Sequence, residues 1–292
     1  HHSEPEPVPH RQREDDRVPA LPHPLLDGAT GDSGEMSASL AQLSQIVQDA
    51  SRGLDQRLEA FEDIIDSEVG DTNLVRVRNL ERELGLRQLY LKFEGGNPTG
   101  TQKDRIAFTQ ALDALRRGFE SLTVATCGNY GVAIAFAASL AGLRSTIHVP
   151  SGYQTRRLQE MISFGAEIVR VPGDYEHALE VSSKLAETEE LYDGNPGGSN
   201  TTLQLRAYGE IANEIYDEFG DAPRAIAVPV SNGTTLAGIY RGFASLYRRG
   251  KTSRMPWIVA GSSFGKNPIV RSYLRKAPEC EDLPPGQIRE TS

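Results

Sequence analysis

From residue 87 onward, short runs rich in β-branched residues alternate with stretches of helical spacing, and glycine-rich or polar loops separate them. The runs predict strands at 89–93, 122–126, 145–149, 167–171, 225–230 and 257–260. The stretches predict helices at 105–117, 132–141, 155–164, 175–188, 202–219, 236–248 and 268–275. Strands that alternate with helices of this length form βαβ units. We therefore predict an α/β fold of two domains, with parallel or mostly parallel sheets flanked by helices.

Composition divides the chain into segments. Residues 1–36 are rich in Pro, Glu, Asp and Arg and have few spaced apolar residues, which is typical of a disordered or extended segment. Apolar residues at helical spacing predict one or two amphipathic helices early in 37–104, which we assign to a large domain together with the first strand. A small α/β domain then covers 105–190, and the large domain resumes over 191–292.

Charge and cysteine content exclude several function classes. The chain has 31 Lys and Arg against 40 Asp and Glu, a net charge of −9, and no basic block, which disfavours nucleic-acid binding. Its two cysteines lie far apart, so they indicate no disulfide framework, no metal site and a reducing cytoplasm. The longest apolar run, 132–143, is too short to cross a membrane, and no signal peptide is visible.

One lysine follows a loop broken by glycine and proline, in Glu94-Gly-Gly-Asn-Pro-Thr-Gly-Thr-Gln-Lys-Asp104. Burial lowers the pKa of a lysine, and the positive end of a helix disfavours its charge, so both effects favour a neutral amine at Lys103. A neutral amine is the nucleophile that Schiff-base chemistry needs. On position alone, a solvated lysine in a first helical turn is the stronger interpretation.

Two more loops follow strands and open helices, at the sheet edge where ligands bind. Ser231-Asn-Gly-Thr-Thr235 combines backbone N–H groups, hydroxyls and a positive helix end, which suits an anion, although a capped turn without a ligand explains it equally. Cys127-Gly-Asn-Tyr-Gly131 lacks the glycine spacing of dinucleotide-binding enzymes. Its Asn129 can hydrogen-bond a phenolic oxygen or serve as a turn residue.

Cys127 is interpreted as a small packing residue, because no histidine is linked to it by a motif. Arg156 and Arg157 can meet an anionic substrate or form a solvated helix face.

Taken together, the three loops resemble those of the fold-type II pyridoxal-phosphate enzymes, which are tryptophan synthase β-like, and within them the threonine synthase family. Residues 97–105 are similar to the family's Asn-Pro-Thr-Gly-Ser-Phe-Lys-Asp-Arg, whose lysine carries the cofactor as a Schiff base. Residues 127–131 resemble its Ser-Gly-Asn-Thr-Gly loop. Residues 228–235 resemble its phosphate-binding Val-Pro-Val-Gly-Asn-Gly-Gly-Asn turn, and 70–74 its Glu-Gly-x-Thr-Pro-Leu segment.

The resemblance implies a lyase or synthase of threonine biosynthesis that uses pyridoxal 5'-phosphate. Its substrates are O-phospho-L-homoserine, or a related O-phospho amino acid, and water, and its products are L-threonine and phosphate. Lys103 is implied as the catalytic residue that carries the cofactor. The other implied cofactor contacts are Asn129, Ser231, Asn232, Gly233, Thr234 and Thr235. The implied substrate contacts are Thr126, Gly128, Tyr130 and Arg105. The family also implies a homodimer.

Three departures from the family keep alternatives open. The phosphate-binding turn has Ser, Thr and Thr where Gly, Gly and Asn are usual, and Tyr130 replaces a small Thr beside the substrate. The Ser or Thr that faces the pyridine nitrogen in the family is not found before Ser292. The alternatives are a serine/threonine dehydratase or β-replacement synthase on the same scaffold, and a catalytically silent binding protein with this fold.

Overall fold

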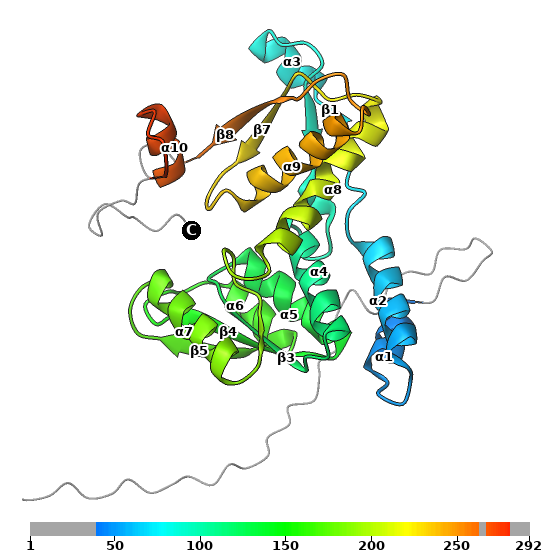
Figure 1. Cartoon of the computed structure of the whole chain (residues 1–292), viewed down its shortest axis with the longest axis vertical. Coiled ribbons are helices and arrows are strands. Elements are labelled where there is room, and N and C mark those ends of the chain that lie inside the picture. Colours follow the sequence, from blue (N-terminus) through cyan, green and yellow to red (C-terminus); the bar gives the residue numbers. More distant parts are fainter. Residues whose placement is uncertain (1–38, 263–266, 281–292) are drawn as a thin grey trace, which may run out of the picture. The chain divides into compact units, whose positions relative to one another are not determined.

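The computed structural model describes residues 39–262 and 267–280, so the segment predicted at 1–36 lies outside the described residues (Figure 1). The N-terminal elements are α1 Leu40–Gln48, α2 Leu54–Glu68, β1 Leu74–Arg76, α3 Arg78–Leu84, β2 Tyr90–Lys92 and the 3-10 turn η1 Glu94–Gly96. The next are α4 Lys103–Arg116, β3 Ser121–Ala125, α5 Asn129–Ala141, β4 Arg144–Pro150, α6 Arg157–Ser163, β5 Glu167–Val171 and α7 Tyr175–Thr188. The last are β6 Tyr192–Asp193, α8 Thr201–Phe219, β7 Ala225–Pro229, α9 Thr234–Arg248, β8 Trp257–Gly261 and α10 Pro268–Leu274.

Four of the strands form a parallel sheet in the order β5-β4-β3-β6. The chain moves from β3 through β4 to β5 and then returns to place β6 on the other side of β3. Ligands bind at such a reversal of strand order, beside the carboxyl ends of the strands. The loops that follow β3 and β6 therefore lie at the edge where a ligand is expected.

Alternate residues of β3 show that α5 and α7 cover opposite faces of this sheet. Leu122 and Val124 belong to the main core with α5. The intervening Thr123 hydrogen-bonds Ser182 of α7, and Ala125 packs in a second core with α7. Successive strand residues point to opposite faces, so each helix takes one of them. Although α5 is almost wholly buried and apolar, no helix of the described residues is long and apolar enough to cross a membrane.

The helix α4 precedes β3 and packs on α5, so its first residue lies at the carboxyl edge of the sheet. The α1–α2 hairpin packs beside α4 and α5, where Phe61 stacks on Phe108 with ring centroids 6.0 Å apart. The predicted helices of the segment 37–104 are therefore present, with α2 packed on α4 and α1 packed on α5.

β7 and β8 form a separate two-stranded parallel sheet, with α8 before it and α9 between its strands. Glycines bring α8 and α9 into close contact (Figure 1). A Cβ atom at Gly242 would lie 2.5 Å from the Gly209 carbonyl oxygen. The N-terminal part of α8 and the start of α9 consequently meet at the carboxyl edge of β7.

The α/β class with mostly parallel sheets is confirmed, and the strands and helices predicted beyond residue 87 begin and end within three residues of those observed. The short elements β1, α3, η1 and β6 were not predicted. The strand predicted at 89–93 is β2, and it pairs antiparallel with β1. β1 and α3 are short and mostly exposed, and β6 has only two residues, so none of them shows the periodic burial that identifies longer elements. The boundaries 37–104, 105–190 and 191–292 stay predictions.

Candidate active site

Lys103 is the first residue of α4, and its amine lies between two aromatic rings. The Nζ atom is 6.0 Å from the ring centroid of Tyr130 and 5.9 Å from that of Tyr208. Burial lowers the pKa of the Lys103 ammonium, and none of the ion pairs of the described residues involves it. Lys103 is therefore not a solvated lysine, because its surroundings favour the neutral amine.

Buried side chains hold the loop that leads to Lys103. The Oδ1 atom of Asn97 accepts the Gly70 N–H at 3.0 Å, and its Nδ2 donates to the Glu94 carbonyl at 2.9 Å. Gly100 has φ 85°, a left-handed conformation that favours glycine. These contacts tie the loop to the segment before β1. The loop before Lys103 is therefore held in place by side-chain hydrogen bonds and not by a strand or a long helix.

Asp104 follows Lys103 and fixes the same loop from the helix side. Its carboxylate accepts the Thr99 N–H at 2.9 Å and the Thr99 hydroxyl at 2.7 Å. The side chain is fully buried, and burial raises the pKa of Asp104 to about 6 even though the Thr99 hydrogen bonds act to lower it. Two residues adjacent in sequence thus carry an amine with a lowered pKa and an acid with a raised one.

Arg105 occupies a buried ion-pair network. Its guanidinium pairs with Glu94 at 2.7 Å and with Glu214 of α8 at 2.6 Å, and Lys92 also pairs with Glu214. Burial acts to lower the pKa of Arg105, but the hydrogen bonds to both carboxylates outweigh it and raise the pKa. In this arrangement the donors of Arg105 are directed to the two carboxylates, and the residue joins α4 to η1 and α8.

Tyr130 presents its ring to Lys103 and its hydroxyl to the core. The hydroxyl donates to the Gly194 carbonyl at 2.6 Å and accepts a hydrogen bond from the Gln110 amide. Gln204 of α8 in turn donates to Gln110 at 3.1 Å. Because Gly194 follows β6, Tyr130 connects the loop after β3 with the loop after β6, where the strand order reverses. Its ring lies on one side of the Lys103 amine.

Asn129 is the first residue of α5 and is exposed. Its Oδ1 accepts hydrogen bonds from Arg157 at 3.0 Å (Nε) and 2.8 Å (Nη2). Arg157 also reaches the Thr99 carbonyl at 3.5 Å, so it lies between the loops that precede α4 and α5. Since Arg157 engages the oxygen of the Asn129 amide, the Nδ2 donors of that amide remain for another acceptor.

The neighbours of Asn129 are also at this edge. Thr126 is buried at the end of β3, and its hydroxyl accepts the Gly128 N–H at 3.4 Å. Gly128 is the N-cap of α5. Cys127 is partly buried and packs against the main core, as a packing residue would.

The loop 231–235 reaches the start of α9. Asn232 Oδ1 accepts the Thr234 N–H at 3.3 Å and the Thr234 hydroxyl at 3.1 Å. Gly233, with φ 83°, is the N-cap and provides no side-chain cap. Burial raises the pKa of the Tyr208 hydroxyl, and the Thr235 side chain beside it acts to lower that pKa, although no hydrogen bond of good geometry reaches this hydroxyl in the described residues. Tyr208 therefore contacts the surroundings of both Lys103 and the 231–235 loop.

Tyr208 is the site residue that sequence reasoning missed. Its helix was predicted, and Gln204 and Tyr208 lie four residues apart, so both occupy one buried face. That spacing was the available signal. It could not show that this face meets Lys103, because the meeting depends on how α8 packs against α4.

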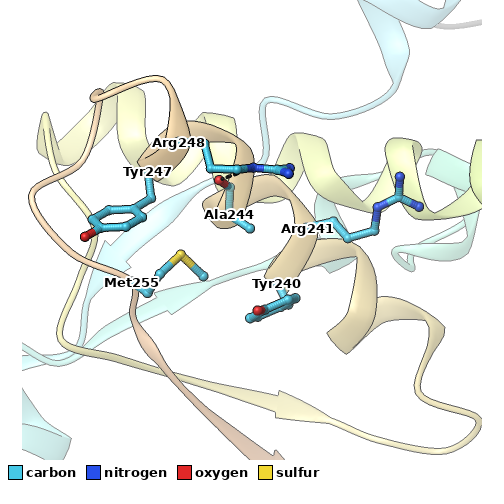
Figure 2. Close-up of a pocket in the computed structure, with 6 residues that line it drawn as sticks. All are labelled: Tyr240, Arg241, Ala244, Tyr247, Arg248 and Met255. Carbon is cyan, nitrogen blue, oxygen red and sulfur yellow. Dashed lines mark hydrogen bonds between the residues drawn. The ribbon is translucent and has the colours of Figure 1, made fainter.

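A separate open hollow lies along the outer side of α9 (Figure 2). Its lining residues are Tyr240, Arg241, Ala244, Tyr247, Arg248 and Met255. Figure 2 shows Met255 between the two tyrosines, and Arg248 donates back to the Ala244 carbonyl at 3.2 Å. None of these residues was predicted as a site residue. Within 39–262 and 267–280, no group of three or more His, Cys, Asp or Glu side chains could hold a metal ion.

Comparison with known families gives a match that includes Lys103 and the three loops described above. Residues 65–287 match the family described as "Pyridoxal-phosphate dependent enzyme", which is most of the chain. The chain belongs to this family. The predicted cofactor, pyridoxal 5'-phosphate, and the prediction that the chain is an enzyme of this kind are confirmed.

Curated relatives give a finer likeness. The chain is 31% identical over 224 residues to a threonine synthase of Methanocaldococcus jannaschii, which covers 76% of this chain and 54% of the relative. It is 31% identical over 211 residues to a threonine synthase of Halalkalibacterium halodurans, which covers 72% of this chain and 58% of the relative. The chain therefore spans little more than half the length of these relatives.

Solved structures of the family share the fold. Maize serine racemase aligns with a TM-score of 0.66 at 19% identity, over 78% of this chain and 66% of that one. Threonine deaminase isoform 2 of Solanum lycopersicum aligns with a TM-score of 0.60 at 19% identity, over 77% of this chain and 61% of that one. At these identities the likeness concerns the fold alone, and it confirms the predicted fold-type II class.

Proposed function

We propose that this family member is a lyase or synthase of threonine synthase type. It converts O-phospho-L-homoserine, or a related O-phospho amino acid, and water to L-threonine and phosphate. One observation carries the proposal: the Lys103 amine lies between Tyr130 and Tyr208, and Tyr208 also touches the 231–235 loop. The 31% identity to threonine synthases supports the reaction type.

The described residues fit pyridoxal phosphate in three respects. Lys103 offers an amine whose pKa burial lowers. Asn129 has free amide donors for the phenolic oxygen, because Arg157 engages only its oxygen. The 231–235 loop, from Ser231 through Asn232, Gly233 and Thr234 to Thr235, opens α9. Asn232 accepts the Thr234 N–H, and the remaining first-turn N–H groups suit a phosphate.

When bound, pyridoxal phosphate supplies an aldehyde that reacts with amines and a ring that takes up negative charge from the substrate carbon. The Lys103 Nζ atom removes and returns protons at the substrate Cα and Cβ atoms. The rings of Tyr130 and Tyr208 keep water from this amine. Thr126, which follows β3, and Gly128, the N-cap of α5, take the substrate carboxylate. Arg105 pairs with Glu94 and so positions the loop before Lys103, and its effect on the substrate is exerted through that loop.

A second candidate is a serine/threonine dehydratase or a β-replacement synthase. It is favoured by Tyr130, whose ring is fixed beside Lys103 by hydrogen bonds to Gly194 and from Gln110. A ring at this place narrows the room for a long phosphorylated side chain. Smaller hydroxy amino acids would fit such a site better.

The test begins with cofactor uptake. We expect the purified chain to gain a visible absorbance band on addition of pyridoxal phosphate, and Lys103→Ala to lose that band. Lys251→Ala, at an exposed lysine in the loop after α9, is the matched control and should keep it. If the wild-type chain stays colourless, both enzyme proposals fail and the third reading, a catalytically silent binding protein, replaces them.

Product analysis then separates the two enzyme proposals. Threonine and inorganic phosphate from phosphohomoserine support the threonine synthase reaction. A keto acid and ammonia from threonine identify a dehydratase, and exchange of the phosphate of phosphoserine for a nucleophile identifies a β-replacement synthase. Lys103→Ala should abolish whichever activity is found.

We also propose that the chain acts in the cytoplasm and forms a homodimer. The two widely separated cysteines support a reducing compartment. Light scattering of the purified chain, with and without cofactor, tests the dimer, and a monomeric mass in both states would overturn it.

A further inference from the structure

Among the described residues, the hydroxyl of Tyr208 lacks the hydrogen-bond partner that a buried tyrosine normally has. The described residues include three fully or nearly fully buried tyrosines, Tyr130, Tyr192 and Tyr208. Tyr130 donates to Gly194, and Tyr192 donates to Asp113 at 2.9 Å. The Tyr208 side chain is 0% exposed, and its hydroxyl makes no hydrogen bond in the described part of the chain. Buried hydroxyls without a partner are rare and destabilising, so each needs an explanation.

The position of this hydroxyl is set by close packing of two helices. A Cβ atom at Gly238 would lie 2.4 Å from the Tyr208 Cβ, so only a glycine lets α9 approach α8 here. The ring then extends past the Lys103 amine, 5.9 Å from its centroid, and the hydroxyl ends beside Thr235. Packing on both sides thus aims the hydroxyl at the first turn of α9.

That turn has donors but no cation of its own. Gly233 caps α9 without a side chain, and the first-turn N–H groups have no acceptors within the helix. The segment 231–235 holds neither lysine nor arginine. The donors of the segment itself are therefore neutral, and a phenol directed at an anion makes a strong, charge-assisted hydrogen bond.

We propose that the Tyr208 hydroxyl donates a hydrogen bond to the phosphate group of the cofactor, as a donor from α8 beside those of the 231–235 loop. This inference rests on the proposed function, because it takes the phosphate to lie at the start of α9. It explains why a buried hydroxyl has no hydrogen-bond partner in the part of the chain that the structure describes. It also gives α8 a direct part in the site that no motif of the three loops contains.

The test compares Tyr208→Phe with Tyr192→Phe in the full chain. Both substitutions remove one hydroxyl from a buried ring, but Tyr192 lies at β6 and has a protein partner. Three ligands are titrated against the cofactor-free protein: pyridoxal phosphate, pyridoxal without the phosphate, and inorganic phosphate. Absorbance reports the first two, and the melting temperature reports the third.

We expect Tyr208→Phe to weaken pyridoxal phosphate binding about 10-fold or more, because it removes one hydrogen bond to a charged group. Its affinity for pyridoxal should stay that of the wild type. The melting temperature of the cofactor-free variant should rise by about 2–4 °C, because no unpaired hydroxyl remains buried. Tyr192→Phe should behave in the opposite way, with unchanged affinity and a lower melting temperature.

Two results would overturn the inference: wild-type affinity of Tyr208→Phe for pyridoxal phosphate, or equal weakening toward pyridoxal and its phosphate. If the wild-type chain binds neither pyridoxal phosphate nor pyridoxal, the proposed function fails. The change of melting temperature with inorganic phosphate then tests the inference about Tyr208 by itself. Stabilisation of the wild type and Tyr192→Phe, but not of Tyr208→Phe, would uphold it. Stabilisation of all three proteins or of none would overturn it.

Discussion

Burial has opposite effects on the pKa values of two adjacent residues of α4. Burial lowers the pKa of Lys103 and raises that of Asp104 to about 6. The Lys103 amine faces aromatic rings without an ion pair in the described residues, so its neutral form is favoured. Asp104 accepts two hydrogen bonds from Thr99, which limit how far its pKa rises. A motif of two residues thus provides both a reactive amine and the anchor of the loop before it.

The raised pKa of Asp104 predicts a pH dependence of stability. Its value of about 6 lies above the reference value of 3.8, so the folded chain binds this proton more tightly than the unfolded chain. Protonated Asp104 therefore contributes about 3 kcal/mol to the free energy of unfolding. This contribution is complete below about pH 4 and is lost as the pH rises through about 6. Asp104→Asn removes this titration.

Urea unfolding between pH 4 and pH 8 provides the measurement. The free energy of unfolding of the wild type, relative to Asp104→Asn, should fall between about pH 4 and pH 6 and stay constant above about pH 7. Asp63→Asn, on the exposed side of α2, is the control and should show no such change. A constant difference between wild type and Asp104→Asn across this range would refute the prediction.

At the scale of elements, buried charges join parts of the chain that are far apart in sequence. Arg105 of α4 and Lys92 of β2 both pair with Glu214 of α8. Glu214→Ala leaves two cations without this partner, and removal of one member of a buried ion pair costs about 3–5 kcal/mol. We expect a loss of this size in the free energy of unfolding.

The control is an ion pair of similar geometry at the surface. Glu62 pairs with Arg116 at 3.0 Å, and both side chains are half exposed. Glu62→Ala should cost less than about 1 kcal/mol, because water screens such pairs. Equal effects of Glu62→Ala and Glu214→Ala would show that the Arg105 network is solvated in the folded chain.

The contact of α8 with α9 gives a prediction about glycine. A Cβ atom at Gly242 would lie 2.5 Å from the Gly209 carbonyl oxygen and 2.7 Å from the Ala212 Cβ, so Gly242→Ala must push the helices apart. Overpacking of this kind costs about 1–3 kcal/mol. Gly152→Ala is the control, because nothing lies within 4 Å of its Cβ position. Urea unfolding should show a loss for Gly242→Ala alone.

These elements also show what the sequence could predict. Helices such as α7 and α8 have long apolar periodicity, and the loops at 97–105, 127–131 and 231–235 have local chemistry, so both were recognisable. The antiparallel partner of β2 was not, because β1 is three residues long and mostly exposed. The approach of Tyr208 to Lys103 and the pairing of Arg105 with Glu214 depend on packing between distant segments, which local spacing does not encode.

At the scale of the whole molecule, the two parallel sheets differ in how they are covered. The four-stranded sheet has α5 on one face and α7 on the other. In the two-stranded sheet, Val228 and Ile258 pack on the main core, whereas Trp257 and Val259 are 70% and 51% exposed. Parallel sheets are normally covered on both faces. One face of this sheet is therefore an apolar surface open to water in the described structure.

Trp257 makes this face measurable, because it is the single tryptophan of the chain. An exposed tryptophan emits as it does in water, so unfolding in urea should move its emission maximum little while circular dichroism records the loss of helix. Acrylamide should quench the folded and unfolded chains to a similar extent. Phe243→Trp in a Trp257→Phe background is the control, since Phe243 is fully buried and its replacement should shift strongly on unfolding. A large shift of the Trp257 emission maximum on unfolding would mean that this face is covered in solution. If the shift disappeared on dilution, a second copy of the chain would cover the face. Trp257→Lys should then abolish the association of the two copies.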